Sequence, residues 1–489
     1  MASNRLYIIL ISSFLLVLIL GFTFDSSLRP RLHGFASPSF DTLTPLLEVN
    51  ETRLSAGVQD SSIAADDIHP IHLNDVSTET TIPSGAHVHG FTILDRVYLR
   101  NGTFYILTSD ASRFPPRRNL ISRPWKKVMG LNLDPTDEDM QFIDIERAHE
   151  VLGSHALRIP DFSVIVYDHP QFMTHFYHWW GEVILGAWRV YSKLSIELDS
   201  GIKALPFPSR FILPVVNVIE EGWRDKAGVD GPLMRAAFPG SSIEVADAWQ
   251  DYKKLNVTVV FDRIMLISRD AAHKHPFGGR WFKMIAGTMN LTVPDGFWGP
   301  VQRSLVDNLL GGIPNVNDDG LVVYPPEFTS SRPIVTYISR QGGGRRLLEK
   351  DHERLVISLK DLEVEGICQV NVAQMELLSL KDQIALVARS TVIVGVHGNG
   401  LTHQLWMPWS KRSTVIEIVY PESYDWDYEM LARNMGHKAL WNDTLITYPK
   451  GTYYKGVTIG ENFHGNSIPV YGPAIAKTIR DLLIDEVGK

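Results

Sequence analysis

The stretch that most constrains the fold is residues 390–408, which read STVIVGVHGNGLTHQLWMP. Residues 391–396 form a short apolar run rich in β-branched side chains, which is typical of a buried strand in a parallel sheet. The four residues that follow are His397, Gly398, Asn399 and Gly400. A strand, a glycine turn and a helix start bring free backbone N–H groups and the positive end of a helix dipole to one point. Such turns bind phosphate in α/β proteins, although a plain turn that only needs glycine at positive φ gives the same pattern.

A basic cluster follows a second predicted strand at residues 334–338. It contains Arg340, Arg345 and Arg346, and glycines separate the first arginine from the other two. Guanidinium groups bind phosphate oxygens bidentately and do not lose their charge. A solvated basic loop is the alternative interpretation of such a cluster. Because both turns follow strands of one α/β segment, we predict that they form a nucleotide diphosphate site together.

Strands and helices alternate regularly in the carboxy-terminal part of the chain, which predicts a parallel, doubly wound sheet. The predicted strands are residues 334–339, 367–372, 391–396, 414–419 and 438–441, and the predicted helices are residues 375–388, 424–434 and 474–487. The amino-terminal part has strand-like runs at residues 103–107, 162–167, 210–213, 257–261 and 263–267, and helical patches at residues 176–194 and 279–289.

The amino terminus predicts a membrane anchor. Residues 6–24 form an uncharged apolar run of about 28 Å as a helix, close to the thickness of a bilayer core. We interpret it as a signal anchor with the amino terminus in the cytosol, with a cleaved signal peptide as the alternative. The composition of residues 25–84, rich in Ser, Thr, Asp and Pro, predicts a flexible stem.

Composition excludes some classes of partner. The net charge of −8, from 55 acidic and 47 basic residues, argues against nucleic acid. Cys368 is the single cysteine, so the chain forms no intrachain disulfide. Five glycosylation sequons fit a secretory lumen and should lie on the surface; they begin at Asn50, Asn101, Asn256, Asn290 and Asn442.

Several motifs occur in an order that resembles the catalytic region of glycosyltransferase family 61. These are Ser339-Arg340, Arg345-Arg346, Asp382-Gln383-Ile384, VIVGVHGNGLTHQLWMP and the VIEI run at residues 415–418. The family includes plant-type β-1,2-xylosyltransferases and lumenal O-linked N-acetylglucosaminyltransferases, and the resemblance covers residues 164–440. It departs from the usual HGAGLTN at two positions, because Asn399 replaces the alanine and His403 replaces the asparagine. Trp406 replaces a common phenylalanine.

The resemblance implies two Rossmann-like domains that face each other across a cleft, the architecture called GT-B. The expected division is a cytosolic tail (1–5), the anchor (6–24), the stem (25–84), an acceptor-side domain (85–310), a linker (311–333) and a nucleotide-sugar domain (334–489). It also implies an inverting transfer from a UDP-sugar, with xylose as the leading donor sugar, to a glycan or glycoprotein in the Golgi or endoplasmic reticulum. No metal or other cofactor is expected, because arginines and a helix start neutralise the diphosphate in such enzymes.

The resemblance also implies roles for individual residues. Arg340, Arg345 and Arg346 are expected on the diphosphate, together with the turn from His397 to Gly400, and Glu417 on the ribose hydroxyls. A surface glutamate is the alternative for Glu417. The catalytic base is expected to be His178 or Glu182, which lie four residues apart and so on one helix face.

Other classes of function remain open on the sequence. His175, His178 and Glu182 could bind zinc, although no second metal motif accompanies them. A UDP-N-acetylglucosamine-dependent protein transferase is an alternative, as is a non-catalytic carbohydrate-binding protein of the lumen. A dinucleotide oxidoreductase is disfavoured, because the chain lacks a GxGxxG turn followed by an acidic residue about twenty positions later.

Overall fold

The computed structural model describes residues 71–72, 79–197, 201–202, 205–217, 219, 222–421, 423–441, 459 and 462–484. The predicted anchor at residues 6–24 and most of the predicted stem lie outside them and stay predictions. Across the described residues, no helix is both long enough and apolar enough to span a bilayer. All described residues belong to one compact unit, Ile63–Lys489. The sequon residues Asn101, Asn256 and Asn290 are exposed, as glycosylation would require.

The carboxy-terminal half contains a five-stranded sheet in which every neighbouring pair is parallel. In spatial order the strands are β15 (Gln369–Ala373), β14 (Ile334–Ile338), β16 (Val392–Val396), β17 (Thr414–Ile418) and β18 (Lys438–Trp441). The strand that comes first in sequence lies between the second and the third, so the winding reverses between β14 and β16. In open parallel sheets, ligands bind at the carboxyl ends of the strands at such a point of reversal. This sheet confirms the predicted parallel strands.

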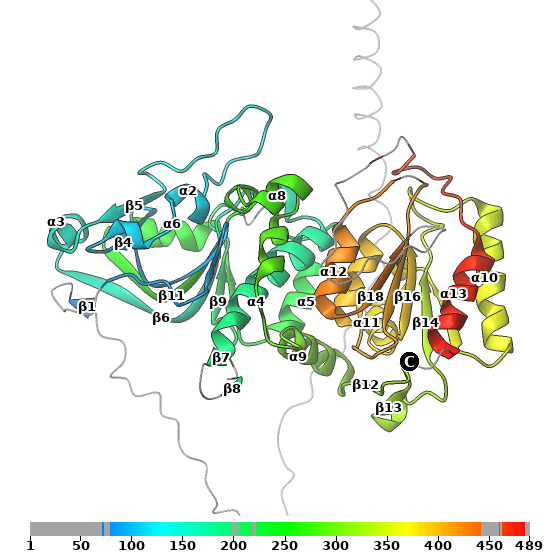
Figure 1. Cartoon of the computed structure of the whole chain (residues 1–489). Coiled ribbons are helices and arrows are strands. Elements are labelled where there is room, and N and C mark those ends of the chain that lie inside the picture. Colours follow the sequence, from blue (N-terminus) through cyan, green and yellow to red (C-terminus); the bar gives the residue numbers. More distant parts are fainter. Residues whose placement is uncertain are drawn as a thin grey trace, which may run out of the picture. The chain divides into compact units, whose positions relative to one another are not determined.

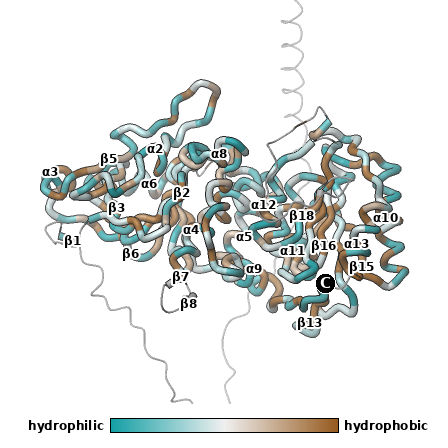
Figure 2. The backbone as a smooth tube through the Cα atoms, viewed as in Figure 1, coloured by the Kyte–Doolittle hydropathy of each residue, from teal (hydrophilic) through white to brown (hydrophobic). Residues whose placement is uncertain are grey.

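Helices cover both faces of this sheet (Figure 1). On one face, α10 (Glu349–Val364) and α13 (Gly472–Ile484) pack together over Val392 and Val394. On the other face, α11 (Leu380–Val387) and α12 (Asp427–Met435) belong to the core that contains Ile393. The hydrophobic colour along β16 in Figure 2 reflects burial on both faces, because alternate side chains of a strand point in opposite directions.

Two elements of this half differ from the predicted ones. The sequence analysis missed α10, because charged residues dominate it and only Leu355, Leu359 and Leu362 are buried. The predicted helix at residues 375–388 is split, since Ser379 caps α11 and its hydroxyl accepts a hydrogen bond from the Asp382 N–H. A short 3₁₀ turn, η9 (Met375–Leu377), precedes the cap.

The amino-terminal half contains a nine-stranded mixed sheet. Seven of its strands follow one another in the spatial order β10 (Ser242–Glu244), β9 (Arg210–Ile212), β6 (His155–Val166), β11 (Thr258–Ile267), β3 (Phe91–Arg100), β4 (Thr103–Leu107) and β5 (Met140–Ile143). Two short strands are added to this order: β1 (Ile71–His72) pairs with β6, and β2 (His87–Val88) pairs with β3. The pairs β11–β3 and β3–β4 are antiparallel, unlike those of a Rossmann-like sheet. The hairpin between β3 and β4 turns at Asn101 and Gly102, whose φ angles are 53° and 91°. Asn-Gly is the preferred sequence for such a two-residue turn.

Shorter elements connect these sheets. The remaining helices are α2 (Arg117–Leu120), α3 (Ala148–Leu152), α4 (Leu185–Ser192), α5 (Asp230–Ala237), α6 (Ala246–Lys254), α7 (Arg269–His273), α8 (Pro276–Trp281) and α9 (Gly299–Leu310). A π-helix, η5 (Tyr177–Ile184), runs directly into α4. The other 3₁₀ turns are η2 (Ala111–Arg113), η3 (Ile145–Arg147), η4 (Pro170–Phe172), η6 (Lys193–Ser195), η7 (Met284–Asn290), η8 (Pro326–Phe328) and η10 (Asn399–Trp406). Two small strand pairs are β7 (Ile196–Glu197) with β8 (Gly201–Ile202), and β12 (Asn315–Val316) with β13 (Val322–Tyr324).

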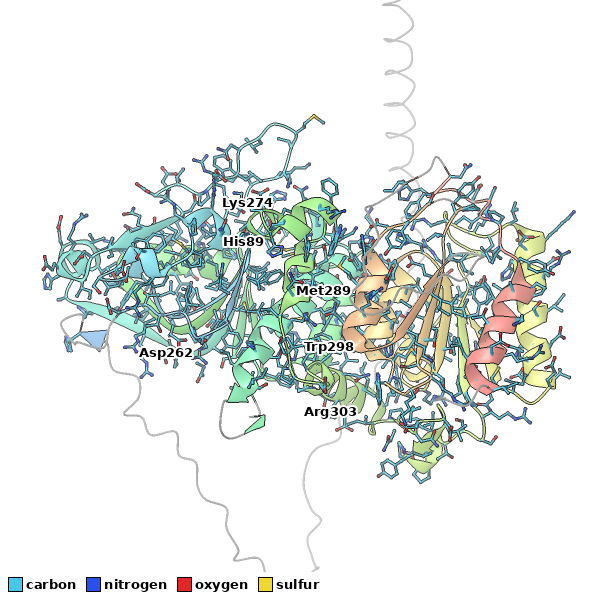
Figure 3. All side chains as sticks on the ribbon, in the orientation of Figure 1. His89, Asp262, Lys274, Met289, Trp298 and Arg303 are labelled. Carbon is cyan, nitrogen blue, oxygen red and sulfur yellow. The ribbon has the colours of Figure 1, made fainter. Side chains whose placement is uncertain are left out.

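One continuous hydrophobic core joins the two sheets. Tryptophans from both halves meet in it: Trp180 contacts Trp406 edge-on with ring centroids 5.1 Å apart, and Trp281 stacks on Trp426 at 4.8 Å. Trp298, labelled in Figure 3, donates its indole N–H to the Leu405 carbonyl oxygen at 2.9 Å. The acceptor-side and nucleotide-side domains that the sequence predicts are therefore tightly packed, and their exact boundaries stay predictions.

Candidate functional site

Arg340 and Arg345 converge on the turn that follows β16. Arg340 comes directly after Ser339 at the end of β14, and its Nη1 donates to the His397 carbonyl oxygen at 2.5 Å. Arg345 Nη1 donates to the same oxygen at 2.8 Å. Because β14 and β16 are adjacent and parallel, their carboxyl ends bring these groups to one edge of the sheet. Arg346 does not join them, since its Nη1 donates to the Gly343 carbonyl oxygen at 3.4 Å.

The two guanidinium groups carry positive charge that the protein does not neutralise locally. Within the described part of the chain, no carboxylate lies within ion-pair distance of Arg340 or Arg345. Burial, followed by the charge of Arg340, lowers the pKa of Arg345. Arg345 also lies over the ring of Phe463, 4.9 Å from its centroid. Two like charges held together without a carboxylate are suited to bind an anion.

The glycine turn allows the close approach of Arg340. Gly398 precedes η10 and has φ 147° and ψ 175°, a conformation that is essentially restricted to glycine. A Cβ atom on Gly398 would lie 1.5 Å from Arg340 Nη1, and one on Gly400 would lie 2.8 Å from Ile338 Cγ2. The first N–H groups of η10 lack partners within the helix and are available to a ligand. Asn399 contributes differently, because its Oδ1 accepts from the Tyr177 N–H at 3.4 Å.

We expect Gly398→Ala to weaken UDP binding by at least about tenfold, because the new methyl group strains the backbone and displaces Arg340. Isothermal titration of the full chain with UDP would measure the effect. Gly240→Ala is the matched control, since its Cβ would meet no atom within 4 Å. Unchanged UDP affinity in Gly398→Ala would contradict the role assigned to this turn.

Glu417 lies beside His397 rather than at the surface. Its Oε1 is 2.5 Å from His397 Nδ1, and both side chains are buried. Burial, reinforced by Asp427 and Glu429, raises the pKa of Glu417 well above its usual value. Burial also lowers the pKa of His397 to about 4. A protonated Glu417 that donates to Nδ1 would fix the proton of His397 on Nε2, so Glu417 is placed to orient this histidine.

The candidate base His178 forms an ordered pair with Glu182 on η5. His178 Nδ1 lies 2.6 Å from Glu182 Oε2, which leaves Nε2 for a substrate, and 25% of the His178 side chain is exposed. Glu182 is fully buried and also accepts from Arg269 Nη1 at 2.6 Å and from the Met284 N–H at 2.9 Å. This arrangement, a histidine oriented by a buried carboxylate, is typical of general-base catalysis. π-Helical segments are frequent at functional sites.

Arg269 keeps Glu182 ionised. Burial by itself raises the pKa of Glu182, but Arg269 and His178 outweigh it and hold this pKa well below its usual value. Arg269 also lies 3.5 Å from Asp168 Oδ2. An anionic Glu182 stabilises a positive charge on His178, which is what a histidine acquires when it accepts a proton.

Three further charged residues were missed by the sequence analysis. Lys283 Nζ lies 3.1 Å from Asp425 Oδ1 and 2.5 Å from Asp427 Oδ1. Asp427 Oδ2 is 3.8 Å from His397 Nε2. One ligand atom from each of His397, Asp425 and Asp427 lies within 4.8 Å of the others, a spacing that could hold a metal ion. The acidic residues follow β17 at the same sheet edge as the arginines, which is a signal that sequence reasoning could have used.

Three departures from the usual family motif contact the same helical segment. Asn399 bonds the Tyr177 N–H, His403 lies against Phe176 with ring centroids 5.0 Å apart, and Trp406 contacts Trp180. These residues therefore shape the contact between the glycine turn and the helix that carries His178.

We expect His403→Asn, which restores the residue usual in the family, to reduce the acid sensitivity of the fold. Burial lowers the pKa of His403 to about 4, whereas the unfolded chain binds this proton near pH 6.5. The free energy of unfolding therefore decreases as the pH falls from about 6.5 to about 4. Each unit of pKa difference corresponds to about 1.4 kcal/mol, so the loss amounts to up to about 3 kcal/mol. Urea unfolding at pH 7 and pH 4.5 would measure the free energy of unfolding. An equal loss of stability in the variant and the wild type would contradict this prediction.

Comparison with known proteins places the residues around this site within a family match. Residues 176–416 match the family described as Glycosyltransferase 61. The chain is also 30% identical over 117 residues to the EGF domain-specific O-linked N-acetylglucosamine transferase of Drosophila melanogaster, a match that spans 24% of this chain and 21% of that relative. Both matches are to glycosyltransferases, and this chain spans about a fifth of the length of the Drosophila relative. The match over residues 176–416 confirms the resemblance to glycosyltransferase family 61 seen in the sequence.

Proposed function

We propose that this protein transfers a sugar from a UDP-sugar to a hydroxyl group of a glycan or glycoprotein, with inversion at the anomeric carbon. The observation that carries the proposal is the convergence of Arg340 and Arg345 on the His397 turn, at the point where the sheet reverses its winding. These groups would neutralise the diphosphate as its bond to the sugar breaks. The GT-B architecture belongs to this proposal: the parallel carboxy-terminal sheet supports one Rossmann-like half, whereas the mixed amino-terminal sheet departs from a second one.

His178 is the proposed catalytic base. Its Nε2 would take the proton from the acceptor hydroxyl as the acceptor oxygen forms its bond to the anomeric carbon. The bond from that carbon to the phosphate oxygen breaks, and UDP leaves with the electron pair. Glu182 holds the ring of His178 and stabilises the resulting imidazolium. Glu417, which we first expected on the ribose, is proposed instead to orient His397.

UDP-xylose is the proposed donor, because the motifs resemble those of the plant-type xylosyltransferases. UDP-N-acetylglucosamine is the second candidate, since the Drosophila relative is named as an N-acetylglucosamine transferase. A few side chains in a pocket decide between donors that differ at single substituents. The proposed location is the lumen of the Golgi or endoplasmic reticulum, with residues 6–24 as a membrane anchor.

A donor screen tests the proposal. The full chain is incubated with UDP-xylose, UDP-N-acetylglucosamine, UDP-glucose and UDP-galactose, and release of UDP is measured with and without a glycoprotein acceptor. We expect one donor to be turned over faster than the others, and the addition of an acceptor to increase the rate. UDP binding without turnover of any donor would favour the carbohydrate-binding alternative, and absence of UDP binding would contradict the proposal.

A further inference from the structure

Lys283 contacts two of the three side chains that could hold a metal ion in this site. It reaches the site from the amino-terminal half, directly after Phe282, which has φ 54° and ends α8. Its side chain is only 10% exposed. Its ammonium group is within 3.1 Å of one oxygen of Asp425 and within 2.5 Å of one oxygen of Asp427. These two carboxylates supply two of the three potential ligands of the His397–Asp425–Asp427 group.

The two carboxylates of the His397–Asp425–Asp427 group lie close together and need a positive group beside them. Asp427 has a 14% exposed side chain, and Asp425 an 11% exposed one, so neither carboxylate is freely solvated. Buried carboxylates so close together repel each other unless a positive group lies between them.

We propose that the ammonium group of Lys283 is the built-in cation of the active site and excludes a divalent metal from the His397–Asp425–Asp427 group. The inference deepens the proposed function, because it assigns a positioning residue to the same site. Lys283 neutralises two carboxylates that lie beside the diphosphate-binding turn and would otherwise repel the diphosphate. It also links the end of α8 to Asp425 and to Asp427 at the start of α12, and so joins the two halves at the site.

The proposal predicts that removal of one amino group creates a metal site. In Lys283→Met the side chain loses its charged terminal atom and keeps most of its length, which leaves a histidine and two carboxylates, a ligand set suited to Mn²⁺. We expect Lys283→Met to bind one Mn²⁺ per chain, at least about 100-fold more tightly than the wild type, because an adjacent positive charge no longer opposes the ion. Lys283→Arg keeps the charge and should bind Mn²⁺ no better than the wild type.

Isothermal titration of the full chain with Mn²⁺ alone is the test. We expect no saturable Mn²⁺ binding to the wild type, and binding to Lys283→Met that is lost when Asp427→Asn is added. Mn²⁺ should also raise the melting temperature of Lys283→Met and not that of the wild type, since a ligand stabilises the state that binds it. Lack of Mn²⁺ binding by a folded Lys283→Met would overturn the proposal.

Titration of the wild type tests whether Lys283 excludes a metal ion, even if Lys283→Met does not fold. One Mn²⁺ bound per wild-type chain, and lost in Asp427→Asn, would show that Lys283 does not exclude a metal, and would overturn the proposal. Neither the Mn²⁺ titration nor the melting temperature depends on transfer activity. A failure of this inference is therefore distinguishable from a failure of the proposed function, which the donor screen tests.

Discussion

Replacement of His178 by alanine should lower kcat by about 10²–10⁴-fold, the usual contribution of a general base. His178 is partly exposed, and its Nδ1 is held by the buried Glu182, so its Nε2 is the nitrogen that can reach an acceptor. Arg340 and Arg345, which we propose to bind the diphosphate, hydrogen-bond the His397 turn and form no described contact with His178. We therefore expect UDP affinity to change little while turnover falls, and steady-state kinetics together with UDP titration would separate the two effects.

Controls make this prediction specific. His149→Ala removes an exposed histidine from α3 and should leave turnover within about twofold of the wild type, as most surface substitutions do. Glu182→Gln should reduce turnover through loss of the negative charge that supports the imidazolium. If His178→Ala retained full turnover, another group would have to be the base, and Asp427 would be the next candidate to test.

Replacement of Arg340 by alanine should lower kcat by about 10²–10³-fold, the effect of removing one group that stabilises developing negative charge. Arg340 bonds the His397 carbonyl oxygen and lies against the glycine turn, so its loss also loosens the turn. UDP affinity should fall with turnover, because the proposal has the guanidinium contact the diphosphate in both the bound and the reacting state. Titration with UDP and initial-rate kinetics would measure both quantities.

Two other arginines serve as comparisons for Arg340. Arg346→Ala should have a smaller effect, since Arg346 bonds the Gly343 carbonyl instead of the turn. Arg354→Ala, on the exposed side of α10, should have none. Equal losses of UDP affinity in all three variants would indicate a general effect of net charge, and would count against a specific diphosphate site.

The sequence was most informative about residues that follow parallel strands, because the sheet determines where such residues lie. Strands β14 and β16 could be recognised from their apolar runs, and the carboxyl ends of adjacent parallel strands must lie together. The contact of Arg340 with the His397 turn was therefore predictable, as was the pairing of His178 with Glu182 four residues later. The mixed amino-terminal sheet was predictable in part, because Asn101-Gly102 between two apolar runs is a hairpin signal that we interpreted only as a glycosylation sequon.

The rest of the site depends on tertiary contacts that no local pattern reveals. Lys283 lies in a segment predicted as one helix, and the structure breaks that helix at Phe282 and directs the lysine toward Asp425 and Asp427. Asp425 and Asp427 follow β17, and Asp427 begins α12, so their place at the strand-end edge could be inferred from the sequence, but their contact with Lys283 could not. Arg269 and Glu182 are 87 positions apart in the chain, and they come together because α7, which carries Arg269, and η5, which carries Glu182, both pack against η7.

The tryptophan-rich core between the sheets has a consequence for how substrates enter. Trp180 with Trp406 and Trp281 with Trp426 are buried contacts between the halves, and a hinge motion would have to expose them to water. We therefore expect the proposed base and the His397 turn to be held in place before any substrate binds, and nucleotide exchange to proceed through local loop movement, without rigid-body opening. Small-angle scattering should accordingly give the same radius of gyration with and without UDP.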